Sequence, residues 1–368
     1  MSKVEWKKLG EVCCIRTGKL NANAQVEDGK FPFFTCDAKP FKIDTYAFDT
    51  EAILISGNGS QVGHLNYYNG KFNAYQRTYV IDDFRDVNVF YLLHYLKSTI
   101  RPYVMDKSKK GSVPYITLPM LEGFTFPIPS LAEQKRIVGI LDTFTASIDN
   151  LKEQIAQRRK QYEYYRDQLL DLEGKEGVEM KTLKEVFDTR NGYTPSTSNS
   201  QFWDEGTIPW FKMDDIRDNG SILNDSNLHI TSLAIKGKGL FKANSIILAT
   251  SATIGVHALI TVEHLCNQRF TNFYPKKCYK DLINMKYLYY YMYKIDEWCK
   301  QHINQGGFAS VDMGGLYNLL LPIPSISDQL RIVNILDKFE ASIKNLEAQL
   351  SLREKQYEYY RNKLLTFE

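Results

Sequence analysis

The chain contains one long segment twice, and this repeat limits its possible folds more than any other feature. Residues 127–173, which begin with PIPS and end at Glu173, align without a gap with residues 322–368. About 29 of the 47 aligned positions are identical, including the string KQYEYYR at 160–166 and again at 355–361. A fold for this chain must therefore accommodate the same element twice.

Each copy carries apolar residues at alternating steps of four and three. The series runs from Ile137 to Leu169 in the first copy and from Ile332 to Leu364 in the second. A 3.5-residue period held over about 33 residues is typical of a left-handed coiled-coil seam. The pattern predicts two long helices, each roughly 60 Å in length.

The starts of these helices also carry a signal. Ser130 and Ser325 each follow a Pro-Ile-Pro sequence and precede an acidic residue by three positions, which predicts that both serines cap a helix. Pairing of the two helices buries both apolar stripes most economically. The alternatives are that each helix packs along its own domain or pairs with another chain, and the pattern does not distinguish a parallel from an antiparallel pair.

The segments before the helices repeat more faintly. Residues 4–19 resemble residues 178–193, residues 52–63 echo residues 245–255, and a Gln-Arg pair occurs at 76–77 and at 268–269. The chain is therefore predicted to be α+β, with two similar mixed α/β domains in tandem, each followed by a long helix. Near-identical helices beside diverged domains suggest that the helices perform one task twice, whereas the domains perform a similar task on different targets.

Composition narrows the class without naming a partner. With 368 residues, 43% of them hydrophobic, the chain can bury a substantial core. A net charge of +3 and a pI of about 8.3 permit nucleic-acid binding but do not indicate it. The six cysteines form no C-x-x-C pair, and no apolar leader or membrane-length apolar run occurs. We expect a soluble cytoplasmic protein with reduced thiols and no membrane partner.

No catalytic or metal-binding motif stands out. The sequence lacks the phosphate loop G-x-x-x-x-G-K-[ST], the G-x-S-x-G elbow, and any Pro-Pro pair that could form an amino-methyltransferase loop. The spacing of His257, His264 and Cys266 fits no common zinc pattern. The pair Asp214–Asp215 is more typical of turn chemistry than of a metal site. The sequence favours a non-catalytic recognition or scaffold protein.

The two PIPS helices, each closing a diverged domain, resemble the specificity subunit of type I restriction-modification enzymes. The segments IPWFKMDDIRDNGSI (208–222), ILATSATIG (247–255) and NQRF (267–270) are similar to that family as well. The resemblance covers essentially the whole chain. It implies target-recognition domains at 1–126 and at 174–321, the latter including a short linker, and spacer helices at 127–173 and 322–368.

The resemblance further implies a mechanism and a set of partners. Each domain would read one half of a bipartite duplex DNA target, and the helices would form an antiparallel coiled coil that sets the spacing and docks two modification (methyltransferase) subunits. Restriction (translocase and nuclease) subunits would complete the endonuclease. S-adenosylmethionine, ATP and Mg would belong to those partners, so this chain is expected to hold no cofactor or metal and to have no catalytic residues.

Candidate DNA contacts are polar and basic residues of the repeated loops, because arginine and glutamine can make bidentate contacts to guanine and adenine, and phosphate contacts position the protein. In domain one they are Arg16, Lys19, Ser56, Asn58, Ser60, Gln61, Gln76, Arg77, Lys109 and Lys110. In domain two they are Arg190, Tyr193, Thr194, Lys212, Thr250, Ser251, Gln268, Arg269 and Gln305.

The repeated heptapeptide is interpreted as a docking surface presented twice. Its tyrosines at 162, 165, 357 and 360 lie on the predicted seam, but the remaining positions do not need to be identical for helix pairing. The docking candidates are Lys160, Glu163, Tyr164, Arg166, Lys355, Glu358, Tyr359 and Arg361. A recent duplication would also leave them alike. Two alternative functions remain, namely a specificity subunit of a standalone methyltransferase system and a coiled-coil scaffold that binds protein or polysaccharide.

Overall fold

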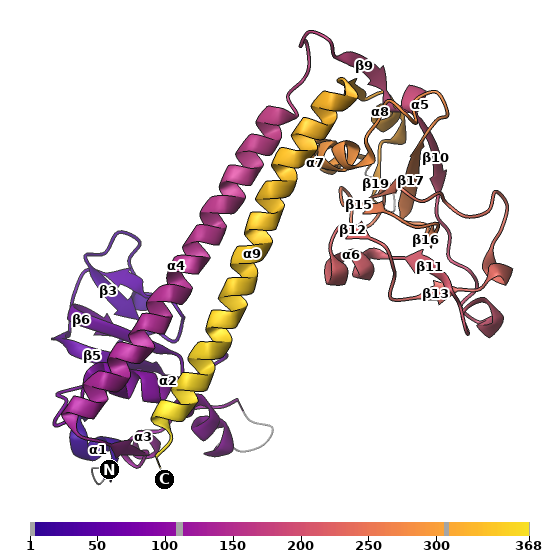
Figure 1. Cartoon of the computed structure of the whole chain (residues 1–368). Helices are drawn as coiled ribbons and strands as arrows, with labels where there is room; N and C mark the ends of the chain where they lie inside the picture. The colour runs from indigo at the N-terminus through magenta and orange to yellow at the C-terminus, as the bar shows by residue number, and fades with distance from the viewer. Residues whose placement is uncertain (1–3, 108–112, 305–308, 368) are drawn as a thin grey trace. The chain divides into compact units, whose positions relative to one another are not determined.

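The structure of the chain is a computed structural model that describes residues 4–107, 113–304 and 309–367 (Figure 1). The chain divides into two compact units. Unit 1 comprises Met1–Gln154 and Leu346–Glu368, and unit 2 comprises Ile155–Asn345. Each unit therefore contains one mixed α/β domain and part of both long helices. The predicted fold class is confirmed, while the predicted domain boundaries, which assign whole helices to separate segments, remain predictions.

The domain of unit 1 is built around a six-stranded sheet with the order β2-β7-β5-β6-β3-β4. Its elements are β1 (Glu5–Lys8), α1 (Leu9–Val12), β2 (Cys14–Thr17), η1 (Ala22–Ala24), β3 (Phe31–Phe34), β4 (Phe41–Ile43), β5 (Phe48–Ser56), β6 (Leu65–Ala74), β7 (Thr78–Asp82), α2 (Val89–Lys107), α3 (Leu118–Glu122) and β8 (Thr125–Ile128). Strands β1 and β8 form a separate antiparallel pair.

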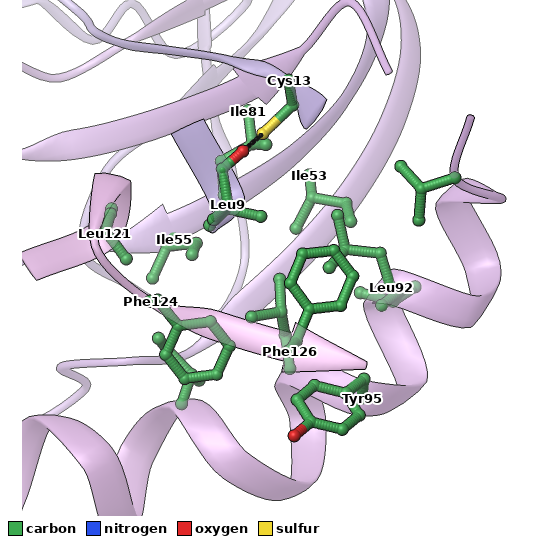
Figure 2. Close-up of a cluster of buried hydrophobic side chains, with 14 of the residues drawn as sticks. Leu9, Cys13, Ile53, Ile55, Ile81, Leu92, Tyr95, Leu121, Phe124 and Phe126 are labelled. Carbon is green, nitrogen blue, oxygen red and sulfur yellow. Dashed lines mark hydrogen bonds between the residues drawn. The ribbon is translucent and has the colours of Figure 1, made fainter. Parts of the chain in front are cut away.

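The core of unit 1 lies between this sheet and helix α2. The apolar run Ala52–Ile55 in β5 is fully buried, as expected of a central strand that is covered on both faces. Figure 2 shows Ile53 on the side of Leu92 of α2, Ile55 beside Leu121 and Phe124, and Tyr95 of α2 next to Phe126 of β8. The Cys13 thiol in the same cluster donates to the Leu9 carbonyl at 3.0 Å. Aromatic and aliphatic side chains thus fill the space between the sheet and helix α2.

The domain of unit 2 has a five-stranded sheet with the order β10-β17-β14-β15-β12 and a smaller sheet with the order β13-β11-β16. Its elements are β9 (Glu179–Thr182), α5 (Leu183–Val186), β10 (Phe187–Asn191), η2 (Ser200–Phe202), β11 (Ile208–Phe211), α6 (Met213–Asn219), β12 (Ile222–Leu223), β13 (His229–Ile230), η3 (Ser232–Ala234), β14 (Ser245–Ala249), β15 (His257–Ile260), β16 (Leu265–Cys266), β17 (Phe270–Pro275), α7 (Met285–Gln301), β18 (Ile303–Asn304), β19 (Ser310–Val311), α8 (Met313–Tyr317) and β20 (Leu320–Ile323).

The two domains share a four-stranded arrangement. The order β2-β7-β5-β6 in unit 1 recurs as β10-β17-β14-β15 in unit 2, with antiparallel neighbours throughout both sets. Helices α2 and α7 follow the same strands in both domains, and each begins after an asparagine that caps its first amides, Asn88 or Asn284. The faint sequence repeat is therefore confirmed as a repeat of topology, decorated differently in each unit.

The long helices are α4 (Leu131–Leu169) and α9 (Ile326–Leu365). The predicted caps are present, because the Ser130 and Ser325 hydroxyls accept from the amides of Glu133 and Asp328 at 3.3 and 3.2 Å. One turn further on, the side chains of Gln134 and Gln329 are fully buried at the junction of helix and domain. No helix in the described ranges is apolar enough over a sufficient length to cross a bilayer.

The two helices pair in opposite directions. In unit 1 the Phe144 ring of α4 stacks on Tyr360 of α9 with centroids 5.3 Å apart, and Lys152 lies 3.6 Å from Glu354. Residue numbers thus rise along α4 as they fall along α9. In unit 2 the same contact recurs with the partners exchanged, since Phe339 of α9 stacks on Tyr165 of α4 at 5.5 Å. The antiparallel coiled coil is confirmed.

Pairing and domain packing occur together within each unit. Ile137 and Leu141 at the start of α4 belong to the core of unit 1, and the end of α9 joins the same core through Leu365. Unit 2 repeats this arrangement with the start of α9 and with Leu170, which follows α4. Pairing of the two helices and packing of each helix on its own domain, which were alternatives in the sequence, therefore both occur.

Candidate nucleic-acid interface

Four segments of unit 1 converge beside the ends of its central strands. The loop after β5 is tied to the loop before β7, because the Gly57 amide donates to the Arg77 carbonyl at 2.8 Å. The segment after α2 joins through the Ile116 amide, which donates to the Gly57 carbonyl at 2.7 Å. The segment after β2 joins through the Gln76 amide, which donates to the Leu20 carbonyl at 2.9 Å. Backbone hydrogen bonds thus link all four segments.

Unit 2 contains the same four-segment arrangement. The Thr250 amide donates to the Arg269 carbonyl at 2.9 Å, and the Val311 amide donates to the Thr250 carbonyl at 2.9 Å. The Tyr193 amide donates to the Cys266 carbonyl at 2.8 Å, which joins the segment after β10. Most of the predicted candidate residues in the described ranges therefore lie in the loop cluster of their own unit, whereas Arg16, Ser56 and Arg190 lie in the strands that lead into it and Lys212 lies elsewhere.

Glycine is required where the segment after β2 crosses the segment before β7, and at the matching crossing of the segments after β10 and before β17. A Cβ atom at Gly18 would lie 1.8 Å from the Ala74 carbonyl oxygen, and one at Gly192 would lie 2.2 Å from that of Cys266. No side chain can be accommodated at either distance. The Gly18–Gly192 correspondence in the sequence thus marks a close backbone crossing that both units share.

The repeated Gln-Arg pair presents its side chains outward from this loop cluster. All four side chains are exposed, while the arginine carbonyls hold the neighbouring loop. The Gln76 amide group donates to the Asn21 side chain at 2.9 Å, and Gln268 accepts from the Thr194 hydroxyl. Exposed amides whose orientation is already fixed are suited to hydrogen bonding with base edges.

Arg16 and Arg190, which are both predicted DNA contacts, form side-chain contacts within their own units. Arg16 forms an ion pair with the buried Asp82 and lies 5.3 Å above the Phe48 ring centroid. Arg190 donates to the Gly239 carbonyl at 2.7 Å and lies 4.0 Å above the Phe241 ring centroid. Burial lowers the pKa of Arg190. Arg190 thus fastens the loop at Gly239, whereas Arg16 contacts residues of strands β7 and β5.

The other candidates divide by exposure. Lys19, Ser60 and Gln61 are exposed, whereas Ser56 is buried and Asn58 accepts from the Cys36 thiol at 3.0 Å. In unit 2 the Thr250 hydroxyl lies 3.1 Å from the Thr271 hydroxyl, and the Lys212 ammonium lies 2.9 Å from the Asp214 carboxylate. The backbone of Ser251 pairs with that of Ser310 in an isolated antiparallel β-bridge. Lys109, Lys110 and Gln305 lie outside the described residues.

One basic pocket was not anticipated from the sequence. Lys97 and Arg101 of α2 line it together with Gln61, Gly63 and His64, and its volume is about 260 Å³. The spacing of the two basic residues, four positions apart, was the available signal. The pocket places two cations beside the loop that follows β5.

Neither metal-site hypothesis gains support. The Asp215 carboxylate accepts from the amides of Lys212 and Asn227 at 2.7 and 2.6 Å, which is the turn role expected of it. His257 lies 2.6 Å from Asp296, and His264 donates to the Val262 carbonyl at 2.9 Å. Across the ranges that the structure describes, no cluster of three or more potential ligands could hold a metal ion.

The docking candidates on the helices fall into two groups. Tyr164 and Tyr359 are 60% and 59% exposed, and each makes an edge contact with the next tyrosine at 5.3 Å. Arg166 lies over the rings of Tyr162 and Tyr293. Arg361 similarly lies over the ring of Tyr357, and the four lysine and glutamate candidates, Lys160, Glu163, Lys355 and Glu358, are exposed. The heptapeptide thus presents the same outward tyrosine in both copies.

Comparison with known proteins finds one family. Residues 1–158 and 175–352 match the model of the type I restriction modification DNA specificity domain. The EcoprrI specificity subunit of Escherichia coli is 50% identical over 217 residues, and the match spans about half of each protein, 55% of this chain and 53% of that one. The EcoR124I/EcoR124II specificity subunit of Escherichia coli is 32% identical over 414 residues, which cover 99% of this chain and 95% of that protein.

A solved structure shares the fold along the whole chain. The S subunit of a type I restriction-modification system from M. genitalium superposes with a TM-score of 0.60 at 15% sequence identity, covering 100% of this chain and 97% of that one. At this identity the likeness concerns the fold alone.

Proposed function

This chain belongs to the family of type I restriction modification DNA specificity proteins, and from that premise we propose that each of its units reads one half of a bipartite duplex DNA target. Its relatives are specificity subunits, so the chain is a non-catalytic specificity subunit of a type I restriction-modification system. The family match does not favour the scaffold alternative. A cluster of four loop segments occurs in both units, and two of the backbone bonds that hold it recur at matching positions, which supports the proposal of two readers.

The differences between the two loop clusters support an asymmetric target. Ser60 and Gln61 follow Gly59 in unit 1, whereas the corresponding loop of unit 2 carries Ala252 and Thr253. Sequence is read by hydrogen bonds and apolar contacts to base edges, so different side chains on one backbone frame select different bases. The two half-sites should therefore differ in sequence.

The long helices would set the distance between the half-sites and bind partner subunits. Helix α4 has 39 residues and α9 has 40, and the Phe–Tyr stacks join them in both units. Members of this family bind DNA and assemble with other subunits. The exposed Tyr164 and Tyr359 offer one surface twice, which suits two copies of one modification subunit. Restriction subunits, S-adenosylmethionine, ATP and Mg would join through those partners.

A binding experiment on the assembled complex tests the proposal. The chain is produced together with its modification subunit and incubated with a randomised duplex library at several salt concentrations. The expected result is enrichment of two unlike sequence blocks separated by a fixed gap, with affinity falling steeply as salt rises. Enrichment of a single block would contradict two readers, and no enrichment would overturn DNA recognition. Sequencing of methylated sites in cells with and without the gene provides an independent readout of the same motif.

A further inference from the structure

We propose that a lysine-bearing glycine turn of unit 2, Lys236-Gly-Lys-Gly239, binds the DNA phosphate backbone, and that Arg190 and Tyr193 position it. This inference rests on the proposed function and assigns phosphate contact to residues outside the candidate set. It also gives a role to Arg190 and Tyr193, two predicted DNA contacts whose side chains form hydrogen bonds within unit 2.

The turn has a conformation that its glycines make possible. Gly237 and Gly239 have φ angles of 57° and 75°, in the left-handed region that residues with a Cβ rarely adopt. The Gly239 amide donates to the Lys236 carbonyl at 3.4 Å and closes the turn. The side chains of Lys236 and Lys238 are both exposed. Two ammonium groups two residues apart are thus presented on a compact loop.

Three contacts fasten this turn to the body of unit 2. The Lys236 amide donates to the Tyr193 hydroxyl at 2.9 Å, and that hydroxyl donates to the Ala234 carbonyl at 2.9 Å. At the other end, Arg190 donates to the Gly239 carbonyl at 2.7 Å while its guanidinium covers the buried Phe241 ring. A loop fixed at both ends loses less conformational entropy on binding than a free one.

The charges of the turn are available to an anion. Just beyond the turn, Lys242 is paired with Glu263 at 3.3 Å. Neither Lys236 nor Lys238 has an acidic partner within residues 4–107, 113–304 or 309–367. The Lys236 ammonium lies 5.9 Å from the Tyr193 ring centroid, which is compatible with a weak cation–π contact that leaves it accessible. The turn thus carries two positive charges that no nearby carboxylate of the described residues neutralises.

The turn also adjoins the predicted base-reading pair. Tyr193, which holds Lys236, directly precedes Thr194, whose hydroxyl donates to Gln268. Phosphate contacts fix the register of a protein on the duplex, and base contacts supply sequence information. A phosphate-binding turn beside Gln268 would hold the backbone while that amide reads a base.

The test compares two charge-neutralising variants in the complex with the modification subunit. Lys236→Gln and Lys238→Gln together should weaken binding to all duplexes alike and lower the slope of log affinity against log salt by about 0.9 per lysine. The ratio between target and non-target affinity should stay unchanged. Lys242→Gln, the matched control with the same charge change at an already paired lysine, should leave the slope as it is.

A double-mutant cycle shows whether Arg190 acts on DNA binding through the two lysines or through the general stability of unit 2. Arg190→Gln alone should weaken DNA binding severalfold, but in the Lys236→Gln/Lys238→Gln background it should have no further effect, because it acts through those lysines. An unchanged slope in the double-lysine variant, or an additive effect of Arg190→Gln, would overturn the inference. If the unmodified complex shows no sequence-preferring DNA binding, the proposed function fails instead.

Discussion

The Gln134 side chain accepts a hydrogen bond from the Asn88 backbone amide at 2.7 Å, so the first turn of α4 completes the cap of α2. Its amide group donates to the Pro129 carbonyl at 2.9 Å, and the whole side chain is inaccessible to solvent. Gln329 makes the same two bonds in unit 2, to Asn284 at 2.8 Å and Pro324 at 2.9 Å. This glutamine is therefore the polar joint between domain and helix in both units.

Replacing the joint should destabilise unit 1. Gln134→Leu leaves the Asn88 amide and the Pro129 carbonyl unpaired at a buried site, which should lower the free energy of unfolding by about 2 to 4 kcal/mol. Urea unfolding followed by circular dichroism measures the loss. Gln168→Leu, at an exposed position of α4, is the control and should change stability little. Equal stability of the two variants would contradict the assigned role.

The stability of unit 2 should fall as the pH drops below neutrality because of His264. Burial lowers the pKa of His264 from 6.5 to about 4, and its ring packs against Phe211 and Phe241. The unfolded chain therefore takes up a proton below pH 6.5 that the folded chain excludes until about pH 4. This stability is fully present above pH 6.5, and about 2 kcal/mol should be lost between pH 7 and pH 5.

Fluorescence can follow this unfolding selectively. In a Trp6→Phe background the remaining tryptophans, Trp203, Trp210 and Trp298, all lie in unit 2. In that background His264→Phe should flatten the dependence of unfolding free energy on pH between 7 and 5. His302→Gln, at an exposed histidine, should preserve it. A slope that persists in His264→Phe would assign the effect to other groups.

The parts of the structure that follow from local periodicity could be predicted, and those that depend on distant partners could not. The seam positions Phe144 and Phe339 were identifiable because a 3.5-residue period is a local property of the sequence, and both stack as expected. Arg16 and Arg190 were predicted to contact DNA because arginine binds guanine and phosphate and because the two positions match in the repeat, and this stays a prediction. Their partners, Asp82 and the Gly239 carbonyl, lie 66 and 49 residues away, and no sequence pattern links such positions.

The repeated glutamines Gln76 and Gln268 should govern different halves of the target. Gln268→Ala removes an amide in unit 2 that could pair with adenine, so it should relax the preference at a base pair of one half-site by about 1 to 3 kcal/mol. Gln76→Ala should do the same in the other half-site only. Selection from a randomised duplex library measures both, with Gln168→Ala as control. If either variant altered both half-sites, the assignment of one reader to each unit would be wrong.

The exposed tyrosines Tyr164 and Tyr359 should determine how many modification subunits bind. Truncation of a central interface tyrosine typically costs about 2 kcal/mol or more, so Tyr164→Ala/Tyr359→Ala should weaken each association about 30-fold. Either single substitution should leave one subunit bound tightly. Native mass spectrometry gives the stoichiometry, and thermal unfolding should show an intact fold. Tyr46→Ala, at an exposed tyrosine of unit 1 outside the helices, is the control. Unchanged assembly of the double variant would refute the docking surface.

The spacing of the two half-sites should follow the length of the long helices. Insertion of one heptad after Gln154 in α4 and after Asn345 in α9 lies where each helix passes from one unit to the other, and it preserves the seam period. Seven helical residues add about 10 Å, which corresponds to roughly three base pairs at about 3.4 Å each. Sequencing of methylated sites should therefore show both half-sites unchanged and the gap widened by that amount. A heptad inserted in α4 alone breaks the match between the paired helices and should abolish recognition. If the doubly lengthened chain methylated the original spacing, the helices would not set the distance between the half-sites.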